Sequence, residues 1–330
     1  MKVYIIGKGA MGTYVGDLLR AVGVEVTYSP RNTDEVRPFD ADVAIVATKA
    51  YDTDSAIEML RRAIVYPEKC VFVSPQNGVG NEEKLATAFG ADNVVAAALT
   101  TPIDRDRDGN ARPAKDGGLA LAPVGANAYN WLAATFAGTG LTVKVVEDWR
   151  ALKWSKLALN VVANASCAIL NVLPNRFVHF DKIFTLEIRM IREVRAVMLA
   201  LRVEPIDLPR YPVRALFRVA ALPSPLSRSL LAHSIAGARG TKPPSLLLDL
   251  RRAKPQTEVD VLNGAVAAAG LELRVPTPVN AVYARVLDDI AHTPPLWAKY
   301  REHPDRLEAE VEAEVKRAKA FSKSLSRANR

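Results

Sequence analysis

The hydrophobic pattern of this chain changes once, near Glu147, and that change limits the folds the chain can adopt. Before Glu147, short apolar runs alternate with longer segments whose apolar residues recur at helical spacing. This alternation is typical of parallel strands covered by helices on both faces. Beyond Glu147 the helical spacing continues, interrupted by prolines. We therefore expect an α/β chain with a doubly wound sheet over residues 1–148 and an all-helical domain over residues 149–330.

The elements of the first domain can be placed from the apolar runs and from the turn residues between them. Strands are expected at residues 3–6, 24–28, 42–48, 70–74, 93–99, 119–123 and 141–146. Helices are expected at residues 10–21, 53–64, 82–89 and 127–136. The polar segment 104–118 is rich in Asp, Arg and Gly, so we expect it to open an antiparallel hairpin with 119–123 as the returning strand.

Composition excludes several classes of protein. The chain has 330 residues, 49% hydrophobic and 24% charged, as in soluble globular proteins. It has no uncharged apolar run long enough to span a membrane, and we expect a cytoplasmic protein without a membrane partner. Cys70 and Cys167 lie far apart, and no histidine pairs with either of them. We therefore expect two reduced core thiols and no metal site.

The net charge of +8 lies largely at the end of the chain. No aromatic residues interleave with the basic ones as in a nucleic-acid site, so a solvated helix end is the favoured interpretation and no nucleic-acid partner is expected. A basic protein also suits an anionic substrate and an anionic cofactor. Leu307, Val311 and Val315 form a helical stripe. This stripe predicts an internal packing face or the face of a homodimer.

A glycine-rich motif lies between the first expected strand and the first expected helix. It consists of Gly7, Lys8, Gly9, Ala10, Met11 and Gly12. In a G-x-G-x-x-G of this context, Gly7 permits the tight turn, Gly9 lets a pyrophosphate approach, and Gly12 lets helix and strand pack closely. The helix N-terminus adds N–H donors for the phosphates. The motif predicts a Rossmann-type dinucleotide site; the alternative is a glycine turn without a ligand.

The end of the second expected strand bears on the choice of dinucleotide. Enzymes that use NAD place an acid there, which binds the ribose hydroxyls and would repel a 2′-phosphate. Here the strand runs into Ser29, Arg31 and Asn32, and no carboxylate appears before Asp34. Arg31 can form a forked contact with a 2′-phosphate, and Ser29 or Asn32 can donate to it. We therefore expect NADPH; the alternative is that Arg31 is an ordinary exposed loop arginine.

Polar residues recur on the otherwise apolar segment that follows the expected domain boundary. Lys156, Asn160 and Asn164 are spaced four apart and fall on one helical stripe. Burying them is costly unless something pairs with them, and the carboxylate and carbonyl of a keto acid would do so. Lys153 and Ser155 are also polar, so a narrow solvent-facing stripe is the alternative.

A second polar cluster lies near the middle of the helical region. It consists of Ser245, Asp249, Thr257, Glu258 and Asp260. Acids among basic residues are usually solvated, which is the favoured interpretation for Asp249 and Asp260. By its pattern alone, Glu258 is an ordinary glutamate in the first turn of a helix.

Taken in order, these segments resemble the ketopantoate reductase family. The matching stretches are GKGAMG at the start, ATKAYDT at 47–53, PQNGVGNEEKL at 75–85, WSKLALNVVAN at 154–164, and SLLLDL with TEVDVLNG within 245–264. The resemblance extends to about Tyr283. It implies NADPH-dependent reduction of 2-dehydropantoate to pantoate, a step of pantothenate and coenzyme A biosynthesis.

The resemblance also implies a role for individual residues. Lys156 would be the general acid that protonates the keto oxygen, and Glu258 would bind the substrate hydroxyl. Asn160, Asn164 and Ser245 would hold the keto acid.

The resemblance extends to the cofactor side. Asn77 would bridge the cofactor ribose and the substrate, and Lys49 would contact the cofactor near its ribose. Arg31 would bind the 2′-phosphate. Since a partly desolvated lysine loses its proton more readily than a solvated one, a proton-donating lysine is chemically coherent.

The chain departs from the family pattern in places that keep alternatives open. The segment between Arg31 and Asp42 is short, Asp249 and Glu258 are separated by one extra residue, and Lys242 stands where a substrate-binding asparagine can occur. The alternatives are a paralogue that reduces another 2-keto acid, a 3-hydroxyacid dehydrogenase, or an NADP-binding regulator without turnover.

Overall fold

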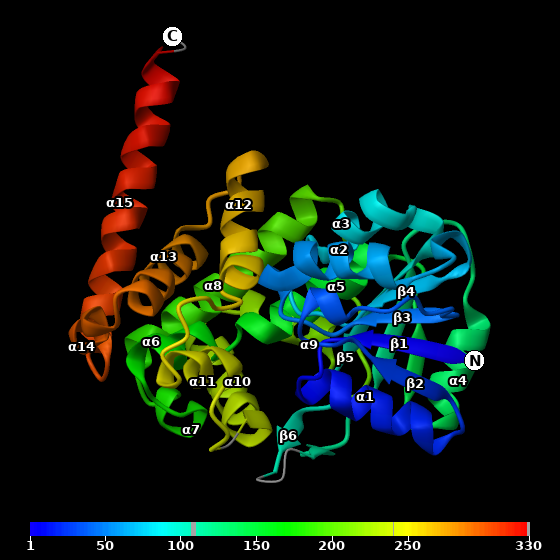
Figure 1. Cartoon of the computed structure of the whole chain (residues 1–330). Coiled ribbons are helices and arrows are strands. Elements are labelled where there is room, and N and C mark those ends of the chain that lie inside the picture. Colours follow the sequence, from blue (N-terminus) through cyan, green and yellow to red (C-terminus); the bar gives the residue numbers. More distant parts are fainter. Residues whose placement is uncertain (107–109, 240, 329–330) are drawn as a thin grey trace. The chain divides into compact units, whose positions relative to one another are not determined.

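A mostly parallel sheet forms the centre of the N-terminal region in the computed structural model, which describes residues 1–106, 110–239 and 241–328 (Figure 1). In spatial order its strands are β2 (Glu25–Tyr28), β1 (Lys2–Ile6), β3 (Val43–Val46), β4 (Val71–Ser74), β5 (Val94–Leu99), β8 (Leu119–Pro123) and β9 (Val143–Val145). Neighbouring strands run parallel except β5 and β8, which pair antiparallel with Leu99 opposite Leu119. The returning strand expected at 119–123 is therefore confirmed.

The polar segment before β8 forms a hairpin of its own. It pairs β6 (Ile103–Arg105) antiparallel with β7 (Ala111–Pro113), separately from the main sheet. Residues 107–109, part of the segment expected to open the hairpin, lie outside the described residues.

Helices cover both faces of the sheet. They are α1 (Ala10–Ala21), α2 (Thr53–Ala63), α3 (Asn81–Phe89) and α4 (Asn130–Gly138). Val3 and Ile5 of β1 pack in one apolar core with α1 and α4, whereas Tyr4 and Ile6 pack in the other with α2 and α3. Alternate residues of a buried strand point to opposite faces, so a continuous apolar run serves both cores. The doubly wound, Rossmann-type fold is confirmed.

One helix begins later than its pattern predicts. Asp92 accepts hydrogen bonds from the Ala126 amide through its carboxylate (2.7 Å) and from the Asn127 side chain through its carbonyl (3.1 Å). The Tyr129 hydroxyl also donates to the Asp92 carbonyl. These contacts hold the residues before Asn130 in a loop, so α4 does not start at residue 127.

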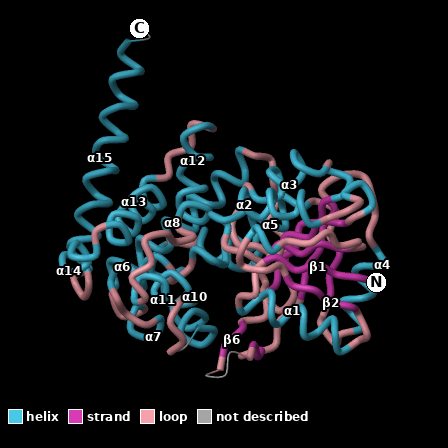
Figure 2. The backbone as a smooth tube through the Cα atoms, viewed as in Figure 1, coloured by secondary structure: helices cyan, strands magenta, loops and turns pink. Residues whose placement is uncertain are grey.

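The rest of the described chain is helical, as expected (Figure 2). The helices are α5 (Trp149–Val161), α6 (Ala165–Leu170), α7 (Pro174–Phe177), α8 (Asp181–Ala200), α9 (Val213–Ala221), α10 (Ser224–Arg239), α11 (Ser245–Arg251), α12 (Ala265–Glu272), α13 (Pro278–His292), α14 (Trp297–Tyr300) and α15 (Pro304–Ala328). Short helical turns are η1 (Thr33–Glu35), η2 (Ala50–Asp52), η3 (Pro67–Lys69), η4 (Ala91–Asn93), η5 (Asp260–Gly264) and η6 (Pro294–Leu296).

The stripe expected on the C-terminal helix packs inside the helical region. α15 contacts α8 and α13, and Leu307 and Val311 are fully buried, while Val315 is half-buried. Ion pairs flank the stripe, among them Arg189 with Glu312 at 2.9 Å and Arg285 with Glu310 at 3.0 Å. The first part of the stripe is therefore an internal packing face.

By compactness the chain divides into two units. One comprises residues 1–156 with 205–212, and the other residues 157–204 with 213–330. The boundary expected between residues 148 and 149 stays a prediction of how the chain divides into domains. None of the helices in the described part of the chain has the length and apolarity needed to cross a membrane.

Candidate active site

The glycine motif forms a turn whose three glycines have different surroundings. Gly7 has a φ of +97°, and a Cβ there would lie 2.7 Å from the backbone of Ala47 and Thr48. A Cβ on Gly12 would lie 2.0 Å from the Gly7 carbonyl oxygen, whereas one on Gly9 would meet nothing within 4 Å. Gly7 and Gly12 are therefore required by the chain itself, and the space in front of Gly9 is open.

The start of α1 lies at the same turn. Gly9 is its N-cap residue, and no side chain caps the helix. Ala10 begins α1, and Met11 packs against the core beneath the sheet. An uncapped helix N-terminus, which carries the positive end of the helix dipole, beside the open space at Gly9 fits the pyrophosphate of a dinucleotide.

Cationic side chains surround the end of β2. The Lys8 ammonium lies 5.2 Å and the Arg20 guanidinium carbon 5.0 Å from the centre of the Tyr28 ring. Arg31 is exposed in the loop that follows. The Asn32 side-chain oxygen accepts from the Asp34 amide at 3.1 Å, which starts η1 and occupies that oxygen. Lys8 and Arg20 therefore place positive charge beside Tyr28, and the role of Arg31 at the 2′-phosphate stays a prediction.

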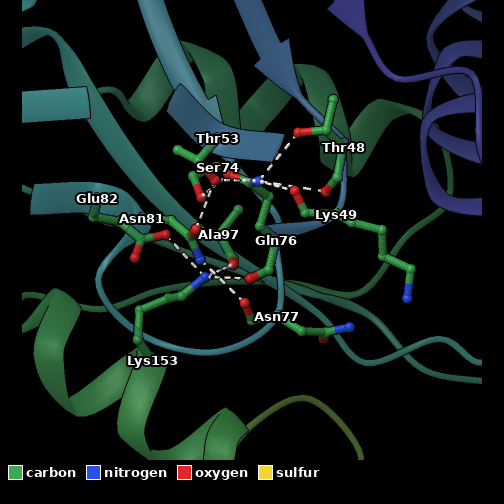
Figure 3. A network of polar contacts seen from close by, with 10 residues as sticks. All are labelled: Thr48, Lys49, Thr53, Ser74, Gln76, Asn77, Asn81, Glu82, Ala97 and Lys153. Carbon is green, nitrogen blue, oxygen red and sulfur yellow. Dashed lines mark hydrogen bonds and ion pairs between the residues drawn. The ribbon is translucent and has the colours of Figure 1, made fainter. Parts of the chain in front are cut away.

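The loops after β3 and β4 are tied together by the Gln76 side chain (Figure 3). Its Nε2 donates to the Thr53 hydroxyl at 2.9 Å and lies 3.3 Å from the Thr48 carbonyl oxygen and 3.4 Å from that of Lys49. Asn81 in turn donates to the Asn77 carbonyl at 3.1 Å. Figure 3 shows the side chains of Lys49 and Asn77 extending away from this network on the same side. The two residues assigned to the cofactor ribose are therefore brought together within one unit.

A buried ion pair lies beside this network. Lys153 of α5 and Glu82 of α3 are 2.9 Å apart, with side chains 1% and 0% exposed. The sequence did not predict this pair, and Lys153 entered only in the alternative of a solvent-facing stripe. Ser155 is also fully buried, and its hydroxyl accepts from the Ile206 amide at 2.9 Å. The apolar surroundings of Lys153 in the sequence could have indicated such a pair, since a lysine that is buried in an apolar helix needs a partner.

Along α5 the accessible residues form a narrow stripe. From Ala151 to the end of the helix, the half-buried residues are Lys156, Leu159 and Asn160, and all others are buried. Lys156 is the last residue of the first unit, and α5 continues into the second. Lys156 and Asn160, two of the three residues predicted to contact the keto acid, are therefore among the accessible residues of this helix.

Asn164 lies just beyond α5, at a break in the helix. Its side-chain amide donates to the Asn160 carbonyl at 3.0 Å, and its side-chain oxygen accepts from the Leu246 amide at 3.2 Å. These bonds bring the start of α11, and thus Ser245, close to Asn164 within the second unit. Asn164 is 4% exposed, and its side chain joins the end of α5 to the start of α11.

A glutamate that the sequence analysis did not identify stabilises the break between α5 and α6. Ala163 has a φ of +48°, unusual for a residue with a side chain. The buried Glu187 carboxylate accepts from the Ala163 amide and from the Ser166 hydroxyl. A glutamate on an amphipathic helix carries no local sign of such a role.

Glu258 is 3% exposed and precedes η5, a π-helical turn rather than the start of an α-helix. Asn263 of η5 donates to the Asn280 side chain at 3.0 Å. Glu193 accepts from the Asn280 backbone at 2.9 Å and from its side chain at 2.8 Å. This network joins η5 to α8 and α13.

Two predictions for acids near Glu258 have different outcomes. Asp260 is exposed, as expected. Asp249 is 4% exposed and pairs with Lys254 at 2.9 Å, so its assignment to a solvated surface was wrong. Since Lys254 lies one turn beyond α11, the pair closes the end of that helix. Among the described residues no group of three or more His, Cys, Asp or Glu side chains is arranged to hold a metal ion.

The fold and the glycine cradle define a Rossmann-type dinucleotide-binding protein with a helical C-terminal region. Two family models match, "Ketopantoate reductase PanE/ApbA" over residues 28–125 and "Ketopantoate reductase PanE/ApbA C terminal" over residues 148–291.

Relatives and solved structures agree with the family models. The chain is 32% identical to the 2-dehydropantoate 2-reductase of Pyrobaculum aerophilum over 73% of this chain and 74% of that protein. It is 30% identical to that of Caulobacter vibrioides over 76% and 78%. The PanE/ApbA family ketopantoate reductase of Ralstonia eutropha JMP134 superposes with a TM-score of 0.71 at 25% identity, covering 91% of this chain and 99% of that one. A D-mandelate dehydrogenase solved with NADH and anilino(oxo)acetate has the same fold, with a TM-score of 0.73 at 18% identity over 90% and 99%.

The chain therefore belongs to the ketopantoate reductase family, whose members are pyridine-nucleotide-dependent reductases, and is an oxidoreductase.

Proposed function

We propose that this protein reduces 2-dehydropantoate to pantoate with NADPH. The observation that carries the proposal is the accessible stripe on α5, where Lys156 and Asn160 stay half-buried while Lys153 and Ser155 are buried. A proton donor and a carboxamide on an otherwise buried helix suit a small anionic substrate with a carbonyl. The relatives at 30–32% identity are named for this reaction.

In the proposed reaction the bound nicotinamide supplies the hydride that reaches C2 of the keto acid. Lys156 donates a proton to the keto oxygen as negative charge develops on it. Glu258 binds the substrate hydroxyl, and Asn160 and Ser245 bind the keto acid. Asn164 holds Asn160 and the start of α11 in place through its two side-chain bonds, which adds a positioning role to the binding role first assigned to it.

NADPH is proposed over NADH because no carboxylate lies at the end of β2. Arg31 forms a forked contact with the 2′-phosphate, and Lys8 adds positive charge beside it. Lys49 and Asn77 extend together from the loops after β3 and β4. Lys49 contacts the cofactor near its ribose, and Asn77 bridges the cofactor ribose and the substrate. The residues Gly7, Gly9, Ala10, Met11 and Gly12 cradle the pyrophosphate.

We also infer that the protein is a cytoplasmic homodimer without a nucleic-acid or membrane partner. A ketopantoate reductase of the same fold from Staphylococcus aureus is described as dimeric. Gel filtration with light scattering tests the oligomeric state.

A second candidate is the reduction of a different 2-keto acid. The similarity in fold to a D-mandelate dehydrogenase favours testing aromatic keto acids as well. Oxidation of NADPH and of NADH is measured with ketopantoate, other branched 2-keto acids and phenylglyoxylate. Highest kcat/KM with ketopantoate and NADPH supports the proposal, and preference for another acid supports the second candidate. Dinucleotide binding without turnover on any acid would indicate a regulator.

A further inference from the structure

The buried Lys153 has a function that its ion pair with Glu82 alone does not explain. Besides Glu82, its ammonium donates to the Gln76 carbonyl at 2.5 Å and lies 3.4 Å from the Ala97 carbonyl (Figure 3). The ammonium thus has one ion-pair partner, Glu82, and two carbonyl acceptors. They lie on the loop after β4, on β5 and on α3, so one side chain of α5 joins three parts of the sheet's carboxyl edge.

The contact between Lys153 and Gln76 lies next to residues that are proposed to take part in the reaction. Gln76 directly precedes Asn77, and its side chain holds the loop of Lys49. Lys153 stands one helical turn before Lys156 on α5. The geometry of a helix relates the directions of side chains three residues apart. Fixing Lys153 against Gln76 therefore fixes the rotation of α5 and the direction in which Lys156 extends.

A gain in folding stability is by itself a weak explanation for a buried ion pair such as Lys153 with Glu82. Removing a lysine and a carboxylate from water costs free energy, and replacing a buried ion pair with apolar side chains is often neutral or stabilising. A directional contact, however, holds two segments in one relative position in a way that apolar packing does not.

We propose that Lys153 is a positioning residue, which sets Lys156 and the Asn77 loop in the relative arrangement that the reduction requires. This inference rests on the proposed function. It assigns no contact between Lys153 and the substrate.

The test compares three variants with the wild type. Lys153→Met removes the ammonium and leaves Glu82 buried alone, so we expect a large loss of stability. Lys153→Met/Glu82→Met removes both charges and is expected to recover most of the melting temperature. Lys84→Met is the matched control, because Lys84 makes an exposed ion pair of 2.7 Å with Asp54 between the same helix α3 and α2.

Three measurements separate positioning from stability. In the double variant we expect kcat to stay about 10–100-fold low with saturating NADPH, since a misplacement of about 1 Å can cost this much. The KM for the keto acid should change by less than about threefold. Hydrogen exchange of the cofactor-free protein should be faster over residues 75–81 in the double variant and unchanged in Lys84→Met.

The outcomes are distinct. A double variant whose kcat recovers together with its melting temperature would show that Lys153 is only structural, and unchanged exchange over residues 75–81 would overturn the anchoring of the loop. If the single variant does not fold, the double variant decides. If neither folds, Lys153→Met/Glu82→Gln, which removes the ammonium donor to Gln76 and leaves a neutral polar side chain at position 82, is measured in their place. Unchanged kcat and exchange in that variant overturn the proposal. A wild type without turnover on any keto acid refutes the proposed function, while the exchange measurement still decides whether Lys153 anchors the loop.

Discussion

A Cβ atom on Gly12 would lie 2.0 Å from the carbonyl oxygen of Gly7. The first turn of α1 therefore crosses the loop after β1 at a distance that excludes any side chain. Gly9, in the same motif, has open space where its Cβ would be. Packing within the fold therefore requires glycine at position 12, whereas nothing within the chain requires it at position 9.

Substitution at these two glycines should separate folding from binding. Gly12→Ala should destabilise the protein by about 1–3 kcal/mol or more, because backbone atoms must move to admit the methyl group. Gly9→Val should leave the melting temperature near that of the wild type and abolish dinucleotide binding, since its side chain occupies the open space. Thermal melts and NADPH fluorescence titration measure both. Normal NADPH binding by Gly9→Val would contradict the cradle.

Arg31→Ala should weaken NADPH far more than NADH. The loss of one charge-assisted contact with the 2′-phosphate corresponds to roughly 1.5–3 kcal/mol of binding free energy. Arg37→Ala is the matched control, because Arg37 is an exposed arginine in the same loop. The KM and Kd of both cofactors are measured. Equal changes for NADPH and NADH would rule out a 2′-phosphate contact.

Lys156→Ala should lower kcat about 10²–10⁴-fold, the usual contribution of a positioned general acid. Cofactor affinity should change little, because the lysine acts on the keto group. The kcat of the wild type should fall at high pH as the ammonium loses its proton, and the variant should lack that limb. A pH–rate profile with ketopantoate tests both expectations.

Lys156→Arg serves as the control for charge. A guanidinium keeps its proton at all working pH values, so this variant should not restore kcat. Turnover within a few-fold of the wild type in Lys156→Ala would remove the lysine from the mechanism and make Glu258 the next candidate acid.

The stability of the helical region should depend on pH through Glu193. Burial raises the pKa of its carboxyl from 4.5 to about 7, against the opposing effect of hydrogen bonds from Asn280 and Val279. Between these two values the folded protein binds more protons than the unfolded chain. Stability from this group is therefore fully present below about pH 4.5 and is lost as the pH rises through about 7.

The variant Glu193→Gln should lack this dependence. At about 1.4 kcal/mol per pKa unit, Glu193 accounts for roughly 2.5 kcal/mol of the change in unfolding free energy between about pH 5 and pH 8. Urea unfolding at both pH values measures the difference, with the exposed Glu204→Gln as the control. An equal pH dependence in the wild type and in Glu193→Gln would contradict the assignment.

Much of the first domain follows from local patterns. The strand at β1 and the helix at α1 were predicted almost to the residue, because an apolar run flanked by glycines and a period of 3.6 are properties of neighbouring residues. The glycine cradle was predicted for the same reason, since the turn, the helix start and the close packing involve residues near one another in sequence or in the adjacent strand.

The surroundings of the polar residues on α5 were decided elsewhere in the chain. Lys153 and Lys156 belong to the same apolar helix, and nothing in their immediate sequence separates them. The burial of Lys153 is compensated by its ion pair with Glu82 and by the carbonyls of Gln76 and Ala97, and those residues lie more than 50 positions away. Lys156 remains half-exposed.

The break after α5 also separates what local sequence predicts from what distant contacts determine. Local periodicity is enough to predict a helix with a Lys-x-x-x-Asn stripe after a dinucleotide-binding sheet. The break at Ala163 depends on tertiary packing, because the carboxylate of Glu187 on α8 accepts the Ala163 amide. The partners of the Asn164 side chain, Asn160 and Leu246, depend on packing in the same way. Periodicity depends on residues within a few turns of one another, whereas the partner of a buried polar group is set by whichever distant segment packs against it.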